Sequence, residues 1–207
     1  MHPALGVLLA YLAGSIPFAL LAGKARGIDL REHGSGNLGA TNAVRVLGRT
    51  AGGMVYLGDT LKGLLPVLVL PQMINASRPD LWAIAFGVAA VAGHVFPIFL
   101  MGKRAGKGVA TGGGVFFGLA WLAALVALGA FVITLGLTRI VSASSIAAAI
   151  VLPIAVLAWR GATDPLFVVS LAIGLFVVFA HRSNIARLRR GEEPRIGRNS
   201  RNKAGAI

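Results

Sequence analysis

Residues 31–45, REHGSGNLGATNAVR, combine small residues and hydrogen-bonding side chains in a pattern suited to binding an anion. Glycines let consecutive backbone N–H groups turn toward one point, which forms a nest that larger side chains would block. Arg45 adds a guanidinium that can hold a phosphate through two parallel hydrogen bonds, and a helix beginning near Thr41 would favour the same ligand. Neutral hydrogen-bonding groups stand at Ser35, Asn37, Thr41 and Asn42. The stretch predicts a phosphate site, although a lone loop of this kind is usually a flexible linker.

A second stretch of the same chemistry lies at residues 102–111, GKRAGKGVAT. It places Lys103 and Lys107 among glycines and ends at Thr111. Two such loops are harder to explain as linkers than one, provided that the fold brings them to the same face. Together they suggest two phosphate-bearing ligands.

Neither loop is a nucleotide-binding motif. Residues 34–39, GSGNLG, match the dinucleotide fingerprint G-x-G-x-x-G, and Asp59 lies twenty residues beyond Gly39. That fingerprint needs a preceding strand and a βαβ unit, whereas this loop follows a long apolar segment. Residues 102–111 have the wrong spacing for a Walker A loop, and no Ser or Thr follows Lys107. We therefore expect no nucleotide and no other cofactor.

Four polar residues stand inside apolar segments, where we expect structural roles: Ser15, Asp59, Lys62 and His94. Ser15 lies close to Pro17 and would cap a carbonyl that the proline leaves free. Asp59 and Lys62 are spaced i, i+3, which predicts an internal ion pair. His94 has apolar neighbours, a setting more typical of a structural hydrogen-bonding residue than of a base.

The elements that must position these groups are membrane-spanning helices. Hydrophobic residues make up 56% of the chain and form blocks long enough to cross a bilayer. The blocks are 3–23, 51–74, 81–101, 108–138, 140–159 and 165–180, all uncharged except 51–74, which contains Asp59 and Lys62. The block 108–138 is too long for one span and has glycines at 112–114, so it predicts two short or re-entrant helices.

The predicted fold class is an all-α polytopic membrane protein with seven transmembrane or partly re-entrant helices. We expect one domain, 1–207, with a basic tail at about 182–207. Basic residues concentrate at 24–49, at 103–107 and in the tail, a pattern that favours cytoplasmic placement of these segments and an external N-terminus. The first span lacks preceding positive charges, unlike a cleaved leader. One cytoplasmic face would then gather four polar stretches: 31–45, 102–111, 138–145 and 181–188.

Composition excludes several other kinds of site. The chain has no cysteine, so disulfides, thiol catalysis and cysteine-bound metals are ruled out. Its seven acidic residues are scattered, which argues against a carboxylate-rich metal site. The net charge of +13 fits positive cytoplasmic loops and attraction to anionic membrane lipids. We expect no partnership with nucleic acid.

Taken together, the polar stretches resemble the bacterial family of acyl-phosphate-dependent glycerol-3-phosphate acyltransferases, PlsY. The resemblance covers the whole chain and is carried by GSIPF (14–18), GIDLREHGSGNLGATNAVR (27–45), D-x-x-K-G (59–63), GHVFP with GKGVAT (93–111), VSASSI (141–146) and HRSNIARLRRGEE (181–193). It implies a multi-pass enzyme of the bacterial inner membrane whose active site faces the cytoplasm. The implied reaction moves a fatty acyl group from acyl phosphate to the 1-hydroxyl of sn-glycerol 3-phosphate, the first step of phospholipid biosynthesis. Its products are lysophosphatidic acid and phosphate.

The resemblance also assigns site residues. It implies substrate and phosphate binding by Ser35, Gly36, Asn37, Gly39, Thr41, Asn42, Arg45, Lys103, Thr111 and Arg182. It implies catalytic roles for Lys107, Ser142, His181 and Asn184, a structural role for Glu192, and no metal. One departure is Arg104-Ala105, which replaces a glycine of the family's second loop and changes the surroundings of Lys103.

The expected chemistry is direct attack, because acyl phosphate is already activated and no Ser-His-Asp relay is evident. The hydroxyl proton would pass either to a phosphate oxygen of the substrate or to His181. The chain lacks the H-x-x-x-x-D signature of acyl-CoA-dependent acyltransferases. The alternatives are a transporter of a phosphorylated anion, with polar groups near the midplane, and a membrane scaffold, which leaves both loops unexplained.

Overall fold

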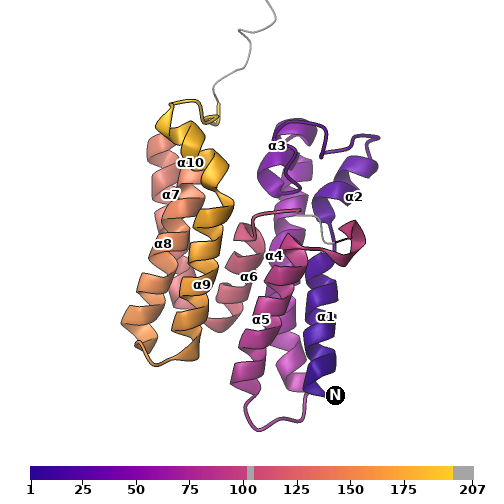
Figure 1. Cartoon of the computed structure of the whole chain (residues 1–207), viewed down its shortest axis with the longest axis vertical. Helices are drawn as coiled ribbons and strands as arrows, with labels where there is room; N and C mark the ends of the chain where they lie inside the picture. Colours follow the sequence, from indigo (N-terminus) through magenta and orange to yellow (C-terminus); the bar gives the residue numbers. More distant parts are fainter. Residues whose placement is uncertain (102–104, 198–207) are drawn as a thin grey trace, which may run out of the picture.

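The computed structural model describes residues 1–101 and 105–197, and every regular element in these ranges is a helix. This confirms the predicted all-helical class. The elements are α1 Pro3–Ser15, α2 Phe18–Lys24, α3 Ala40–Leu47, α4 Arg49–Met73, α5 Pro79–Val95, the 3-10 turn η1 Ile98–Leu100, α6 Val109–Leu119, α7 Trp121–Thr138, α8 Val141–Arg160, α9 Pro165–Ala180 and α10 Arg182–Arg189. The long helices run side by side along the molecule (Figure 1).

Within the described ranges, five helical segments are long and apolar enough to cross a membrane. They are Pro3–Lys24, Arg49–Met73, Pro79–Leu100, Trp121–Thr138 and Val141–Arg160. α9 and α10, bent by 55° relative to each other, would together make a sixth, and α6 is a shorter apolar helix. The chain is therefore a multi-pass membrane protein with five or six candidate spans, and the predicted number of seven membrane segments stays a prediction.

The predicted division of block 108–138 is confirmed. α6 ends at Leu119 and α7 begins at Trp121, with Ala120 between them at φ −153° and ψ 66°. Figure 1 shows α6 beginning partway along the bundle, while α7 returns to the end that carries α10. The N-terminus of α6 therefore lies inside the bundle, where an ordinary span would have continued to its edge.

The role predicted for Ser15 is wrong in one respect. Pro17 has no N–H, and the helix breaks there between α1 and α2. The carbonyl of Ala13, which a residue with an N–H at position 17 would have bonded, accepts instead from the N–H of Ile16 at 3.2 Å. Ser15 Oγ donates to the carbonyl of Tyr11 at 2.8 Å and accepts from the N–H of Ile98 at 3.4 Å. It ties α1 to η1 and caps no freed carbonyl.

Glycines allow α4 and α6 to pack with their backbones in contact. A Cβ at Gly63 would lie 2.1 Å from the carbonyl oxygen of Thr111, and a Cβ at Gly114 would lie 2.0 Å from that of Thr60. Small residues at helix contacts are a common packing device in membranes. Here they hold the first turn of α6, with Thr111, directly against α4.

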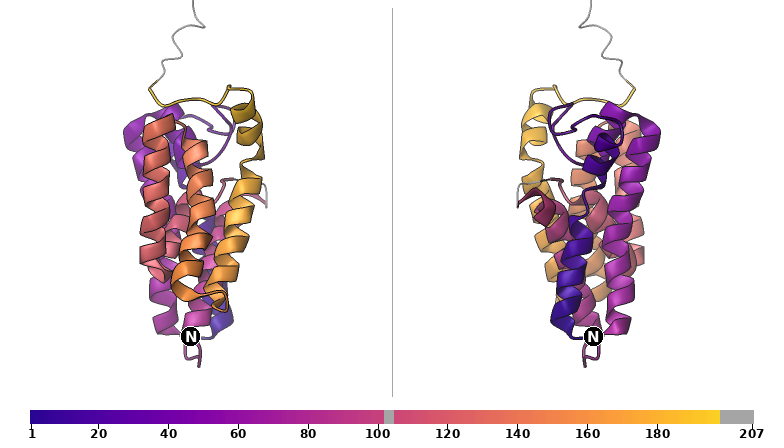
Figure 2. Two further views of the ribbon diagram at one scale, coloured as in Figure 1. Left: turned by 90° about the vertical axis from the view of Figure 1, so that its left-hand side faces the viewer. Right: turned by 90° about the vertical axis from the view of Figure 1, so that its right-hand side faces the viewer.

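Three of the four predicted polar stretches lie at the end of the molecule opposite the N-terminus. Figures 1 and 2 show α2, α3, the α7–α8 turn and α10 at that end. The segment before α6 lies deeper, partway along the bundle (Figure 1). The sequence predicted that all four stretches lie on one face. In the structure the segment before α6 lies further into the bundle than the other three stretches.

Candidate active site

Asn42 fixes the shape of the glycine-rich loop. It lies on α3 with only 2% of its surface exposed. Its Oδ1 accepts from the N–H of Ser35 at 2.8 Å, and its Nδ2 donates to the carbonyls of Leu30 and His33 at 3.2 and 3.0 Å. The predicted role of Asn42 as a phosphate ligand is therefore not what the structure displays, because its amide is committed to the loop backbone.

The glycines of this loop adopt the conformations that the nest interpretation requires. Gly34 and Gly36 have φ values of +66° and +69°, a region that favours glycine. A Cβ at Gly34 would also lie 2.2 Å from Asn42 Oδ1. The predicted helix start near Thr41 is confirmed, since α3 begins at Ala40 with Gly39 as its N-cap.

The remaining predicted residues of the first loop stay accessible to a ligand. Ser35, Gly36, Thr41 and Arg45 are exposed, while Asn37 and Gly39 are half-buried. A Cβ at Gly39 would lie 2.9 Å from Asn37 Oδ1, so the Asn37 amide lies over the start of α3. These positions can accept a phosphate, and their contacts with one stay predictions.

The two loops predicted to bind phosphate are joined by a backbone hydrogen bond. The N–H of Leu38 donates to the carbonyl of Ala105 at 3.0 Å, and the N–H of Ala105 donates to the carbonyl of Val95 at 3.1 Å. Gly108 then caps α6 at φ +79°. The sequence prediction that distant loops share one site is therefore supported at the level of the backbone. Lys103, a predicted phosphate ligand, lies outside the described residues.

Thr111 lies in the first turn of α6 and is fully buried. Its Oγ1 has no hydrogen-bond partner within the described part of the chain. A buried hydroxyl without a partner is costly. A hydroxyl without a partner remains able to bond a ligand, which is consistent with the predicted role of Thr111 in binding a substrate.

A chain of hydrogen bonds links Lys107 to the carboxylate of Glu193. Lys107 Nζ donates to Asn184 Oδ1, and Asn184 Nδ2 donates to Glu193 Oε1 at 2.6 Å. Ser142 Oγ donates to the same carboxylate oxygen at 2.7 Å. Arg187 Nε donates to the other oxygen, Oε2, at 2.7 Å. The structure thus brings together Lys107, Ser142 and Asn184, which the sequence predicts as catalytic residues.

This arrangement sets the charge state of the Lys107 side chain. Burial lowers its pKa to about 8, with the positive charges of Arg187 and Arg45 acting in the same direction and that of Glu193 opposing them. Burial alone would raise the pKa of Glu193, but hydrogen bonds from Asn184, Ser142 and Arg187 lower it below the usual range. The site therefore pairs a firmly ionised carboxylate with an ammonium that can lose its proton near neutral pH.

His181 lies at the junction of α9 and α10 with 4% of its surface exposed. Its Nδ1 is 2.8 Å from the carbonyl oxygen of Val177. A carbonyl can only accept, so Nδ1 carries a proton and a neutral ring presents Nε2 as an acceptor. Arg182 is placed differently, since it is exposed and its guanidinium lies 4.9 Å from the centroid of the Phe179 ring. The structure does not join Arg182 to the Lys107 network.

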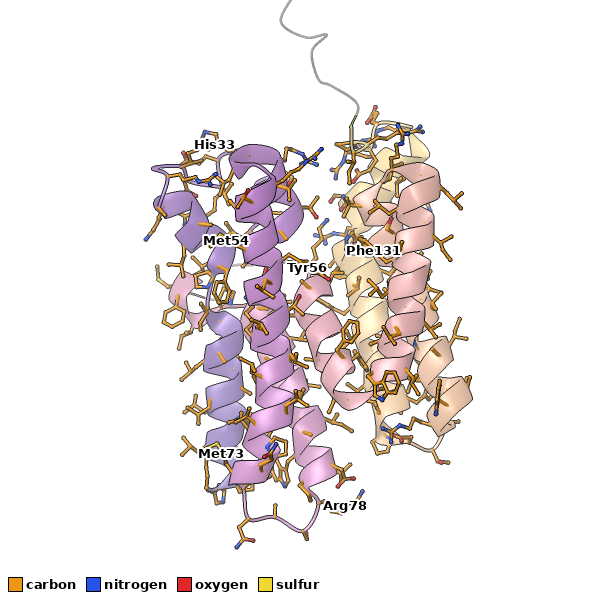
Figure 3. The ribbon with its side chains drawn as sticks, turned by 180° about the vertical axis from the view of Figure 1, so that it is seen from behind. His33, Met54, Tyr56, Met73, Arg78 and Phe131 are labelled. Carbon is orange, nitrogen blue, oxygen red and sulfur yellow. The ribbon has the colours of Figure 1, made fainter. Side chains whose placement is uncertain are left out.

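An apolar cavity of about 120 Å³ adjoins these groups. It is bounded by α4, α6, α7, α8 and α9, and its lining includes Gly108, Gly112, Phe116, Ser145 and Val177. Tyr56 and Phe131, labelled in Figure 3, also belong to the lining. A cavity of this character, next to cationic loops, suits a molecule with a charged head and an apolar chain.

The sequence model of the family described as "Glycerol-3-phosphate acyltransferase" matches residues 4–191. The chain belongs to this family. It is 50% identical over 186 residues to the glycerol-3-phosphate acyltransferase of Geotalea daltonii, covering 89% of this chain and 92% of the relative. It is 49% identical over 189 residues to that of Geobacter sulfurreducens, covering 91% and 94%.

The fold is similar to solved structures of the integral membrane glycerol 3-phosphate acyltransferase PlsY. Against the glycerol 3-phosphate form, the TM-score is 0.86 at 36% identity, covering 94% of this chain and 96% of that one. Against the lysophosphatidic acid form, the TM-score is 0.82 at 36% identity, covering 94% and 95%. The glycerol-3-phosphate acyltransferase family thus accounts for both the sequence and the fold of this chain.

Sequence reasoning missed Glu193 as a site residue of this family member. It gave a structural role to Glu192 instead, but in the structure the contacts with Ser142, Asn184 and Arg187 are made by Glu193. Glu192 forms an exposed ion pair with Arg190 at 2.7 Å. The adjacent glutamates were visible in the motif, but the chain reversal at Gly191, φ +70°, decides which one points inward.

The ion pair predicted for Asp59 and Lys62 is present, whereas the hydrogen bond expected of His94 is not, since His94 Nδ1 has no hydrogen-bond partner among the described residues. Lys62 Nζ and Asp59 Oδ1 are 2.7 Å apart, which confirms the internal ion pair. His94 Nδ1 lies 3.6 Å from the same carboxylate oxygen, beyond hydrogen-bond distance. Lys62 also donates to the carbonyl of Ile16 at 2.8 Å, beside the break between α1 and α2. Within the described residues, no group of three or more His, Cys, Asp and Glu side chains could hold a metal ion.

Proposed function

We propose that this chain transfers a fatty acyl group from acyl phosphate to the 1-hydroxyl of sn-glycerol 3-phosphate, giving lysophosphatidic acid and inorganic phosphate. Family membership supports acyl transfer to glycerol 3-phosphate. The similar PlsY structures are described as glycerol 3-phosphate and lysophosphatidic acid forms. The observation that carries the proposal is the hydrogen bond between Leu38 and Ala105, which joins two phosphate loops beside an apolar cavity.

The proposed reaction requires few protein groups. The hydroxyl oxygen of glycerol 3-phosphate attacks the carbonyl carbon of acyl phosphate, and the bond from that carbon to the phosphate oxygen breaks. The hydroxyl proton passes to a phosphate oxygen. Arg45 and Lys107 neutralise phosphate charge and hold the reactants in place, which can account for much of the rate. His181, with its ring oriented by Val177, accepts a hydrogen bond at the reacting groups through Nε2.

The choice of acyl donor tests this function directly. Purified protein supplied with glycerol 3-phosphate and palmitoyl phosphate should form lysophosphatidic acid and release one phosphate per product. Palmitoyl-CoA should give no turnover, because neither loop has a nucleotide-binding pattern. Product analysis by mass spectrometry with a phosphate assay checks both statements. Comparable rates with the two donors would rule out the proposed donor.

His181 tests the proton-transfer step. If a substrate phosphate takes the proton, His181→Gln should keep substantial kcat, since glutamine still forms hydrogen bonds. If His181 is an obligate base, the kcat of His181→Gln should instead fall by about 10²–10⁴-fold. His2→Gln, at the opposite end of the molecule, serves as the control for the assay. An inactive His181→Gln enzyme that elutes as folded protein and binds both substrates would contradict the proposed step.

We propose that the site faces the cytoplasm of a bacterial inner membrane, with the N-terminus outside. The support is that Lys24, Arg31, Arg45, Lys107 and the basic residues of α10 all belong to the loops and helices of the site end. Single cysteines can be introduced cleanly because the chain has none. Cysteines at Glu32 and Ser183 should react only from the cytoplasm, and those at Ser77 and Ala162 only from outside. The reverse labelling pattern would invert the orientation.

A further inference from the structure

His94 is the buried side chain on which the second phosphate loop rests. It lies in the last turn of α5 with 5% of its surface exposed. A Cβ at Gly106 would lie 2.0 Å from His94 Nε2 and 2.6 Å from Cε1. The backbone of Gly106 therefore lies against the imidazole, with no space for a side chain between them. The next residue along the chain is Lys107.

Asp59 and Lys62 support the opposite edge of the same ring. Asp59 Oδ1 is 3.6 Å from His94 Nδ1 and 2.7 Å from Lys62 Nζ. Lys62 is held in turn by the carbonyl of Ile16 at 2.8 Å. Asp59, Lys62 and His94 are all buried. The imidazole therefore lies between Asp59 of α4 and the backbone of Gly106.

Among the described residues, the segment 105–107 is also held at its two flanks, where Ala105 packs into a hydrophobic cluster with Leu38 and Val55. Ala105 is bonded to Val95 on one side and to Leu38 on the other. Lys107 is bonded to Asn184. Gly106 stands between these anchors, and the space that its Cβ would take is filled by the His94 ring. The depth of the segment 105–107 in the bundle therefore depends on that ring.

We propose that His94 is a positioning residue for acyl transfer: its ring, supported by Asp59, sets the depth of Gly106 and thereby aims the Lys107 ammonium at a substrate phosphate. This inference rests on the proposed function. It gives the buried Asp59–Lys62–His94 cluster a part in the reaction without any contact with substrate.

A double-mutant cycle between positions 94 and 106 tests the proposal. Gly106→Ala places a methyl group against the ring and should lower kcat/KM by about 10²-fold, as expected for a displaced binding group. His94→Asn keeps a polar atom near Asp59 but removes the Nε2 edge, which leaves room for that methyl group. The double variant should be more active than Gly106→Ala alone. Losses that simply multiply would overturn the proposal, because independent sites behave additively in free energy.

A second readout separates positioning from general stability. Among the described residues, the charged or titratable groups that face Lys107 are Glu193, Arg187, Arg45 and His181. If His94→Asn lets the loop shift, Lys107 becomes less buried and the alkaline limit of kcat/KM moves to higher pH. If His94→Asn has a reduced kcat/KM but the same alkaline limit as the wild type, the positioning role of His94 is contradicted. Gly129→Ala is the matched control, since a Cβ there meets nothing within 4 Å.

Binding of inorganic phosphate, measured by calorimetry on the same variants, does not depend on the acyl donor. The double-mutant cycle between positions 94 and 106 should show the same coupling in the Kd of phosphate as in kcat/KM. If acyl phosphate proves not to be the donor, the phosphate measurement still tests the positioning role of His94. Size-exclusion elution in detergent establishes the fold of each variant. If His94→Asn does not fold, His94→Ala takes its place in the cycle. Combined with Gly106→Ala it should again be more active than Gly106→Ala alone, and losses that multiply would again overturn the proposal.

Discussion

Glu193→Ala should abolish most of the activity and destabilise the end of the molecule that carries the site. The substitution removes a carboxylate that accepts hydrogen bonds from Ser142, Asn184 and Arg187 at 2.6–2.7 Å. Only 7% of the Glu193 side chain is exposed. The residue as a whole is half-buried, and losing charge-assisted hydrogen bonds of this kind costs about 1.5–3 kcal/mol, because the remaining donors are left unpaired. Asn184 would also lose its orientation toward Lys107.

The neighbouring residue provides a matched control for this experiment. Glu192 forms an ion pair with Arg190 whose side chains are both more than half exposed. Exposed pairs of this kind contribute about 0–1 kcal/mol, so Glu192→Ala should leave turnover and thermal stability almost unchanged. Acyl transfer and the unfolding temperature, both in detergent, measure the two variants. Equal effects at positions 192 and 193 would contradict the assignment of Glu193 to the site.

Lys107→Ala should lower kcat/KM by about 10–10²-fold, because a charge-assisted hydrogen bond of about 1.5–3 kcal/mol is lost. Lys24→Ala, which removes an exposed lysine at the same end of the molecule, should have little effect. Phosphate binding requires the protonated ammonium, and the pKa of Lys107 is lowered to about 8 by burial. The wild-type kcat/KM should therefore be constant below this pH and fall as the pH rises through about 8.

Lys107→Arg separates charge from geometry in the same experiment. A guanidinium stays protonated throughout this range, so the alkaline fall should disappear from the profile even where the absolute rate is lower. In the part of the chain that the structure describes, the other charged or titratable groups facing Lys107 are Glu193, Arg187, Arg45 and His181. A Lys107→Arg enzyme that still loses activity near pH 8 would show that another group is responsible for the alkaline limit.

The helices were predictable because each apolar block is bounded by charged or glycine-rich segments. The division of block 108–138 followed from its length, since one helix of that length would extend beyond a bilayer. The ion pair of Asp59 and Lys62 followed from helical spacing alone. In each case the deciding information is local in the sequence, so a pattern of a few residues was sufficient.

The details of the site were less predictable because they depend on contacts between distant segments. Asn42 has the chemistry of a ligand, but the path of the loop around it decides that its amide bonds to backbone groups. The choice between Glu192 and Glu193 depends on one positive φ at Gly191. The depth of Ala105 depends on its bonds to Val95 and Leu38. None of these features has a signature in residue type or spacing.

The segment after α10 closes back over the turn between α7 and α8, where the N–H of Ile196 donates to the carbonyl of Arg139 at 2.8 Å. This hydrogen bond and the contacts of Glu193 join the last described residues to helices that are synthesised much earlier. A nascent chain that has inserted every helix through α9 still lacks the carboxylate that orients Asn184. During translation, the site is therefore completed last, after the membrane-spanning helices are already in place. A released chain that ends before residue 193 would contain the sequences of all the described helices but not the carboxylate that bonds Ser142, Asn184 and Arg187.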